Sequence, residues 1–272
     1  MQSAAALIQN ANFKGFFTGK IYAGAAKSVC VPGLNCYSCP GAVGACPIGS
    51  LQNSLSAYSF KFPYYVVGLL VFFGAVLGRI VCGFLCPFGF LQDLIDKLPF
   101  PKKIGTFKYD KALRKIKYAV LIIFVIIMPI AVKLTPFFCK YICPSGTISG
   151  ILLALGDNAL FSLFGSQFMW KLCILCSVLL LSAVIFRPFC KYICPLGAFY
   201  GLFNKYAAVK MSIDSDKCIS CGKCARVCKM NCDPSAEPNS AECIRCGECI
   251  DACPEKAIKY TAFDLKQTKK NP

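Results

Sequence analysis

The sequence predicts an α-helical membrane bundle of about four spans, followed by a small α+β domain. Two observations predict the bundle: 56% of the 272 residues are hydrophobic and only 16% are charged, whereas about a quarter are charged in a typical soluble domain. A third observation indicates a separate C-terminal domain, because closely spaced cysteines are concentrated in residues 211–260. We therefore predict a membrane domain over residues 1–210, a cysteine-rich domain over 211–260 and a polar tail over 261–272.

Four segments are predicted to span the membrane. They are residues 1–22, 62–78, 118–132 and 172–186. Residues 1–22 are helical in pattern but contain Lys14 and Lys20, whereas the other three have charge-free cores slightly shorter than the roughly 20 residues that a span usually needs. Flanking lysine and aromatic residues can anchor such short spans at the membrane surface. A buried core helix is the alternative for any one segment, but several in one chain with so few charges favour a membrane.

Basic residues predict the orientation of these spans. Residues 97–117 contain eight lysines or arginines and one acid, and short basic loops lie in the cytoplasm. Spans 62–78 and 172–186 then run inward and span 118–132 runs outward. The C-terminal domain becomes cytoplasmic, and residues 30–60 lie outside, which requires the span at 1–22. The net charge of +17 belongs mostly to the membrane part, so no nucleic-acid binding is predicted.

The cysteine count points to metal chemistry. The chain has 21 cysteines and no histidine, so histidine-ligated haem, Rieske centres and histidine-containing zinc sites are excluded. Disulfide-rich scaffolds are short secreted chains, unlike this apolar one. If the protein carries out redox chemistry, cysteine-ligated iron is the expected cofactor.

Two runs in the C-terminal domain share the spacing C-x2-C-x2-C-x3-C at an offset of 25 residues. This is the run of bacterial proteins with two [4Fe–4S] clusters, in which the fourth cysteine of each run binds the other cluster. Cluster 1 is therefore predicted at Cys218, Cys221, Cys224 and Cys253, and cluster 2 at Cys243, Cys246, Cys249 and Cys228. Zinc ribbons or disulfides are the alternatives. The domain resembles bacterial two-cluster ferredoxins, which implies a small α+β ferredoxin fold.

Cys-Pro motifs recur in the membrane domain. The heptamer Phe-Cys-Lys-Tyr-Ile-Cys-Pro occupies residues 138–144 and again 189–195, and a looser copy runs from Cys82 to Pro87. Cysteines four apart share one face of a helix. A following proline ends that helix and suits the first position of the next one. Half-helices are therefore expected at these motifs, with free N–H groups that favour an anionic cluster.

The predicted orientation divides these cysteines into two sets. The inner set, at the cytoplasmic face, contains Cys82, Cys86, Cys190 and Cys194, enough for one cluster. The outer set contains Cys30, Cys36, Cys39, Cys46, Cys139 and Cys143, enough for one cluster or more. Which four of these six bind metal stays open. Structural or redox-labile thiols are the alternative for the inner set, and disulfides are the alternative for the outer set. Cys173, Cys176 and Cys232 remain unassigned.

Most of the chain resembles the membrane-bound polyferredoxins. These include the quinol-dehydrogenase-like subunits of periplasmic nitrate reduction and the nitrous-oxide regulator. The resemblance rests on C-x3-C-P motifs after membrane helices, followed by the double ferredoxin run. It implies electron transfer across the cell membrane between a quinone or cytosolic reductant and a partner. It also implies that the outside partner carries a flavin or a haem.

The predicted function is therefore that of an electron-transfer subunit, with two clusters in the ferredoxin domain and one or two in the membrane domain. The sequence shows no catalytic residue pair, so a non-catalytic role in an oxidoreductase complex is expected. One alternative is a quinone oxidoreductase with a pocket near Phe84, Phe88 and Phe90. Another is a redox sensor or a maturation factor.

Overall fold

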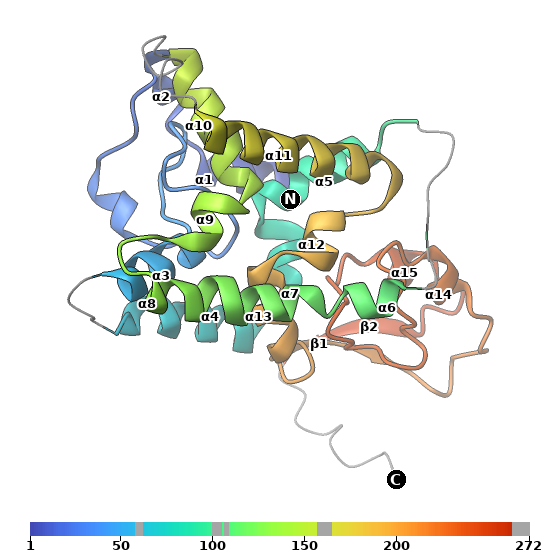
Figure 1. The fold of residues 1–272 in the computed structure, drawn as a ribbon. Helices are drawn as coiled ribbons and strands as arrows, with labels where there is room; N and C mark the ends of the chain where they lie inside the picture. The colour runs from blue at the N-terminus through green and yellow to red at the C-terminus, as the bar shows by residue number, and fades with distance from the viewer. Residues whose placement is uncertain (58–61, 100–104, 106–108, 157–164, 263–272) are drawn as a thin grey trace.

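The computed structural model describes the chain except for residues 58–61, 100–104, 106–108, 157–164 and 263–272. The predicted polar tail lies outside the described residues from 263 onward, and so does part of the basic loop at 97–117. The remainder is mostly helical, with one small two-stranded sheet near the C-terminus (Figure 1).

Three of the four predicted spans form helices close to their expected bounds. The span predicted at 62–78 is α4 (Tyr64–Leu77), and the span predicted at 172–186 is α11 (Ser166–Val184). The span predicted at 118–132 runs without interruption through α7 (Ile116–Val120), the π-helix η3 (Leu121–Ile127) and α8 (Met128–Ala131). Within the described residues, α11 is the one helix whose length and apolar composition suffice to cross a membrane. The structure thus holds one candidate span.

The first predicted span, over residues 1–22, is wrong. The segment forms two short helices, α1 (Gln2–Gln9) and α2 (Phe13–Thr18). The helix breaks at the asparagines between them, and the Asn12 side chain donates to the distant Pro40 carbonyl oxygen at 2.7 Å. At the other end of α1, the Gln2 amide donates to Asp93 Oδ2 at 2.7 Å. Polar side chains therefore tie this segment to the rest of the fold.

The half-helices expected at the Cys-Pro motifs are confirmed. Four helices begin at the proline of such a motif: α3 (Pro47–Ser56), α5 (Pro87–Asp96), α10 (Pro144–Gly156) and α13 (Pro195–Phe203). Short turns precede three of them: η2 (Val81–Leu85, a π-helix), α9 (Phe137–Tyr141) and α12 (Pro188–Tyr192). Proline suits the first helical position because its missing N–H would have no partner there.

The C-terminal domain has the expected α+β composition. Strand β1 (Val209–Ile213) pairs antiparallel with β2 (Ile258–Ala262), so β2 extends two residues past the predicted boundary. Two short helices, α14 (Lys223–Val227) and α15 (Glu248–Asp251), follow glycines with φ of 66° and 91°. Glycine adopts such positive φ without steric cost. The remaining short elements are η1 (Ala25–Ser28) and α6 (Asp110–Leu113).

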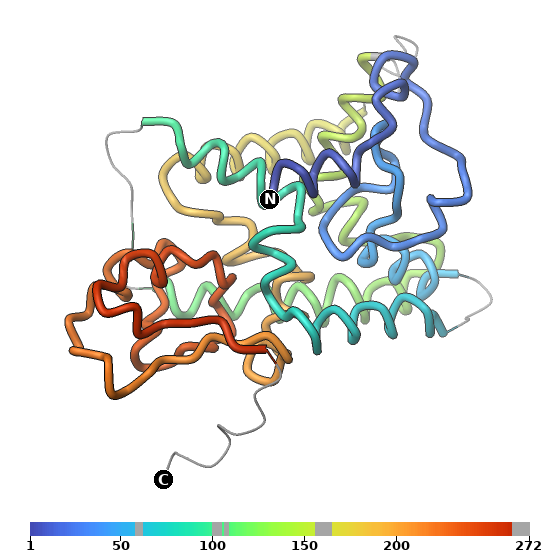
Figure 2. Tube along the Cα trace, turned by 180° about the vertical axis from the view of Figure 1, so that it is seen from behind, coloured from blue at the N-terminus to red at the C-terminus, as the bar shows by residue number. Residues whose placement is uncertain are grey.

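This domain packs against one end of the helical body (Figures 1 and 2). The C-terminal end of α4 and the N-terminal end of α7 both meet it: Gly78 lies beside Arg245, and Lys117 pairs with Glu242. Just past α11, the Phe186 ring lies under the Lys229 ammonium at 5.3 Å. The three helices therefore alternate in direction.

Candidate iron–sulfur sites

The four cysteines predicted for cluster 1 line one cavity. Cys218, Cys221, Cys224 and Cys253 surround it, together with apolar residues of both strands. The two ferredoxin runs also share an unusual backbone: Ser220 and Arg245, at equivalent positions, both have φ of 53°. The internal duplication read from the sequence is thus a duplication of loop structure.

The four cysteines predicted for cluster 2 also come together. Burial raises the pKa of the Cys249 thiol to about 12, and the nearby Cys243, Cys246 and Cys228 thiolates add to that rise. Cys228 belongs to the first run, and the structure places it near the first three cysteines of the second run. Cys232 lies beside this group, since its N–H donates to Cys228 Sγ at 3.4 Å.

The inner set converges as a buried group. Cys82, Cys86, Cys190 and Cys194 are each at most 8% exposed. Burial raises the pKa of Cys190 to about 12; the Arg187 guanidinium opposes this rise, and the Cys86 and Cys82 thiolates increase it.

Hydrogen-bond donors already point at three of these sulfurs. Gln92 Nε2 donates to Cys190 Sγ at 3.1 Å. The N–H groups of Leu34 and Gly197 donate to Cys86 and Cys194 Sγ, each at 3.4 Å. Such hydrogen bonds stabilise thiolates that bind iron.

The outer set divides into four and two. Cys36, Cys46, Cys139 and Cys143 line one cavity of about 620 Å³, together with Lys140 and Lys171. Cys30 and Cys39 are not among its lining residues. Cys30 Sγ lies behind the cavity wall, 3.5 Å from Oγ of the lining residue Ser50, and Cys39 Sγ is 3.8 Å from Asn10 Oδ1. The structure thus brings four of the six outer cysteines to one cavity.

These thiol groups fit cubane clusters better than single metal ions. Within the part of the chain that the structure describes, no three Cys, Asp or Glu side chains are placed to hold one metal ion. A cubane spreads its four thiolates over four iron atoms, so its ligands lie farther apart. Purely thiolate donors around a cavity suit iron–sulfur clusters.

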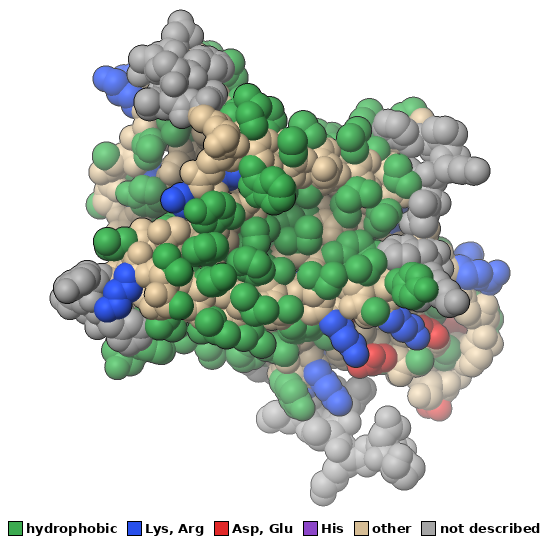
Figure 3. Space-filling view, in the orientation of Figure 1, with side chains coloured by type: hydrophobic (Ala, Val, Ile, Leu, Met, Phe, Trp, Pro, Cys, Tyr) green, Lys and Arg blue, Asp and Glu red, His purple; other side chains and the backbone are tan. Residues whose placement is uncertain are grey.

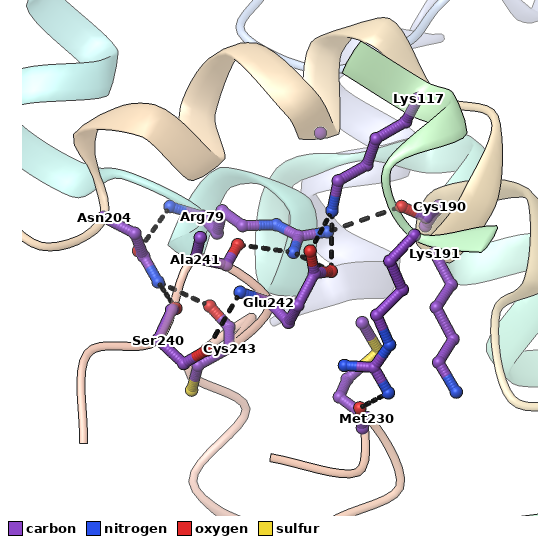
Figure 4. A network of polar contacts seen from close by, with 12 residues as sticks. Arg79, Lys117, Cys190, Lys191, Asn204, Met230, Ser240, Ala241, Glu242 and Cys243 are labelled. Atoms are coloured by element: carbon purple, nitrogen blue, oxygen red, sulfur yellow. Dashed lines mark hydrogen bonds and ion pairs between the residues drawn. The ribbon is translucent and has the colours of Figure 1, made fainter. Parts of the chain in front are cut away.

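The ferredoxin domain and the inner set meet at a buried polar junction (Figure 4). The fully buried Arg79 side chain donates to the Ala241 carbonyl oxygen at 2.8 Å, to Glu242 Oε2 at 3.1 Å and to the Cys190 carbonyl oxygen at 3.4 Å. Lys117 Nζ lies 2.6 Å from Glu242. Burial alone would raise the pKa of Glu242, but Arg79 and Lys117 outweigh it and lower that pKa.

Sequence reasoning missed two groups of residues. Arg79 and Glu242 carried no signal, because their pairing joins segments 163 residues apart. The second group consists of residues that follow the Cys-Pro motifs, and these did carry a sequence signal. Each helix-starting proline is followed two residues later by glycine, at Gly49, Gly89, Gly146 and Gly197. In the first two motifs the pattern extends to a glutamine, Gln52 or Gln92.

A further cavity of about 430 Å³ lies where the start of α5 meets the N-terminal loop, and Cys39 is the cysteine among its lining residues. Phe88 and Phe90 line it, together with the polar residues Asn10, Asn35 and Ser149. Phe84, the third aromatic residue suggested for a quinone pocket, is not among its lining residues.

Comparison with known proteins identifies the same parts of the chain. A family model described as a 4Fe-4S binding domain matches three times, at residues 62–106, 116–160 and 168–213. A second model with the same description matches residues 211–232 and 236–259. Together they cover more than half of the chain, and they include both halves of the C-terminal duplication. No solved structure matches.

The chain is also similar to curated proteins. It is 30% identical over 201 residues to the uncharacterized protein MJ0749 of Methanocaldococcus jannaschii, covering 72% of this chain and 69% of that protein. It is 29% identical to the methylamine utilization ferredoxin-type protein MauN of Paracoccus denitrificans, over 65% of this chain and 58% of MauN. It is 30% identical to the ferredoxin-type protein NapH of Haemophilus influenzae, over 59% of this chain and 51% of NapH. The match thus spans little more than half of these last two relatives. The chain therefore belongs to the 4Fe-4S polyferredoxin family and is an iron–sulfur electron-transfer protein.

Proposed function

We propose that this chain is a membrane subunit that passes electrons between its ferredoxin domain and a partner on the opposite side of the membrane. The observation that carries the proposal is the contact between cluster 2 and the inner set. Gly83 lies between Cys82 and Cys86, and Ile244 lies between Cys243 and Cys246. A Cβ on Gly83 would be only 2.6 Å from the Ile244 carbonyl oxygen. The two ligand loops therefore touch through their backbones.

A second contact continues the series. Leu34 donates its N–H to Cys86 Sγ of the inner set and also lines the cavity of the outer set. The second ferredoxin run, the inner set and the outer cavity are thus joined through one or two residues. A bound cubane supplies reversible one-electron chemistry. A donor at one end would lose one electron for each electron gained by an acceptor at the other.

The apolar surface of the body supports a membrane location. Only 22% of the apolar window of α11 is buried, whereas the core helix of a soluble protein is mostly buried. Figure 3 shows hydrophobic side chains over the face made by α11 and the α7–η3–α8 helix. Exposed hydrophobic residues of these two helices include Ile122, Ile126 and Leu180. With the basic loop at 97–117, this supports a multi-pass protein of the cell membrane with a cytoplasmic ferredoxin domain.

The proposed partners follow from this orientation. A cytosolic reductant or a quinone would exchange electrons on the inside, and a flavin- or haem-bearing protein would do so outside. Lys140 and Lys171 border the outer cavity and would favour a partner with an acidic surface there.

Electron passage can be tested in sealed vesicles. The protein is purified without oxygen and inserted into liposomes that enclose ferricyanide, a one-electron acceptor; dithionite is then added outside. We expect ferricyanide to lose its colour faster than in liposomes that enclose ferricyanide but lack the protein. Replacing both Cys190 and Cys194 by alanine should abolish the gain, whereas replacing the exposed Cys173 and Cys176 should not. Equal rates for both double variants would refute the proposal.

The 430 Å³ cavity lined by Phe88 and Phe90 favours one second candidate, a quinone oxidoreductase. Its aromatic wall and its amide and hydroxyl groups are typical of sites that bind flat, partly polar ligands. Mixing the prereduced protein with a soluble quinone should then oxidise the protein within seconds, and Asn35→Leu should slow this step. Absence of any quinone reduction would exclude this candidate.

A further inference from the structure

We propose that Cys36, Cys46, Cys139 and Cys143 hold an additional [4Fe–4S] cluster, in a site built on the same plan as the inner set and completed by Gln52. The inference deepens the proposed function and rests on it for the cluster type. It selects four ligands of the six outer cysteines, excludes Cys30 and Cys39, and gives Gln52 a positioning role.

The two sites are assembled from matching pieces. The outer group takes Cys46 from the stretch Cys-Pro-Ile-Gly-Ser-Leu-Gln at residues 46–52, and the inner group takes Cys86 from Cys-Pro-Phe-Gly-Phe-Leu-Gln at residues 86–92. Each group then takes both cysteines of one identical heptamer. Only the fourth ligand differs in origin: Cys82 precedes Cys86 by one helical turn, whereas Cys36 comes from the loop before α3.

The backbone of the two heptamers is the same. In each, the N–H of the second cysteine bonds to the carbonyl oxygen of the leading phenylalanine at 2.9 Å, Cys143 to Phe138 and Cys194 to Phe189. The proline that follows then starts α10 or α13. Both pairs of thiols are therefore presented by the same turn, in front of a new helix N-terminus.

The two glutamines provide the independent observation. Gln92 and Gln52 are both fully buried. Gln92 Oε1 accepts from the Phe189 N–H at 3.2 Å while its Nε2 donates to Cys190 Sγ. Gln52 Oε1 accepts from the Phe138 N–H at 3.0 Å, so the Gln52 amide has the same orientation toward its phenylalanine as the Gln92 amide.

Gln52 Nε2 has no hydrogen-bond partner among the residues that the structure describes. Buried amide donors are almost always bonded, so such an atom requires an explanation. The equivalent donor of Gln92 bonds the cysteine after the phenylalanine, and at the outer site that residue is Cys139. A cluster-bound thiolate or sulfide there would satisfy Gln52.

Glycines leave room for the cluster. A Cβ on Gly49 would lie 3.9 Å from Cys139 Sγ, and one on Gly146 would lie 3.9 Å from Cys36 Sγ. A larger side chain at either position would occupy the space between the thiols. The same two motif positions are glycine at the inner site, Gly89 and Gly197.

The first test counts iron and acid-labile sulfide per chain on protein purified without oxygen. Clusters at all four sites give about 16 iron atoms, because each cubane holds four. Replacing Cys139 and Cys143 by alanine should reduce the count to about 12, and the matched double variant of Cys30 and Cys39 should leave it unchanged. A wild-type count near 12, or a loss of iron in the control, overturns the inference without affecting the vesicle assay of the inner site.

The second test keeps every ligand and is read by redox titration with electron paramagnetic resonance. Gln52→Leu should retain the full iron count and lower the midpoint potential of one cluster, because a hydrogen bond to sulfur stabilises the reduced form. Gln92→Leu should lower the potential of a different cluster. If Gln92→Leu shifts a signal and Gln52→Leu shifts none, Gln52 does not face a cluster and the proposed site is wrong.

Discussion

Glu242 is the acid that balances two fully buried bases, Arg79 and Lys117. Changing it to glutamine leaves both cations without their carboxylate partner. Loss of one member of a buried ion pair typically costs about 3–5 kcal/mol. We expect Glu242→Gln to lower the thermal unfolding midpoint of the detergent-solubilised protein and to loosen the ferredoxin domain from the body.

The matched control is Asp214→Asn in the same domain. Asp214 pairs with Lys217 at 3.9 Å, and both side chains are exposed. Exposed pairs contribute about 0–1 kcal/mol, so this variant should unfold close to the wild-type temperature. Similar shifts for both variants would show that burial at the junction does not govern its strength.

Gly83 tests the contact between the two ligand loops. Alanine there would place its Cβ against the Ile244 carbonyl oxygen, and forcing in an extra methyl group costs about 1–3 kcal/mol. We expect Gly83→Ala to separate the loops and slow electron transfer from cluster 2 to the inner set, measured by stopped-flow absorbance. Gly68→Ala in α4 meets nothing within 4 Å and should transfer electrons at the wild-type rate.

For individual residues, the sequence best predicted the cysteine groups whose members are close along the chain. The spacing of the ferredoxin runs determined which four cysteines would meet at clusters 1 and 2. Arg79 and Asn204 could not be assigned in this way, because each acts on residues far along the chain: Asn204 donates to the Ser240 and Cys243 carbonyl oxygens at 2.6 and 2.9 Å. Such contacts depend on how the domain docks.

Among the elements, the Cys-Pro helices were predictable because proline sets a helix start locally. The span at residues 1–22 was not, because its prediction came from a topology count rather than from the segment itself. Asn10 and Asn12 carried the contrary signal, since asparagine competes with the helix for backbone hydrogen bonds. Local polarity was the better guide.

The candidate span α11 can be tested as an element. Cys176 is exposed near its middle, and a lysine inside a span costs about 2.5–3.5 kcal/mol. In a translocon insertion assay with glycosylation sites flanking the segment, Cys176→Lys should reduce insertion strongly. Met169→Lys, near the helix start beside Lys171, should have little effect because lysine can reach the surface there. Equal insertion of both variants would contradict a spanning α11.

For the whole molecule, metal binding predicts which thiols are protected. Cys221 and Cys246 are exposed, but both are predicted ligands. We expect N-ethylmaleimide to label them only after iron is removed with a chelator, as read by peptide mass spectrometry. The unfolded apoprotein, in which all 21 cysteines should react, calibrates the labelling. Rapid labelling before iron removal would show that these two residues do not bind iron.

The sequence could not predict which four of the six outer cysteines would line one cavity, because this depends on how the whole chain folds. Cys36 and Cys39 lie three residues apart in one loop, and either spacing suits a metal site. Their separation arises when residues 30–46 fold against α9 and α10, which places Cys36 at the shared cavity and Cys39 beside Asn10. The repeated Cys-Pro-x-Gly-x-Leu-Gln stretch was the local clue.

The distribution of ligands along the chain also imposes an order on biogenesis. The outer group is complete once Cys143 leaves the ribosome, the inner group after Cys194, cluster 2 after Cys249 and cluster 1 only after Cys253. Nascent chains would thus become competent for cofactor loading from the buried sites toward the soluble end. A chain truncated before residue 243 would carry the two cysteine groups of the body but a complete ligand set for neither ferredoxin cluster.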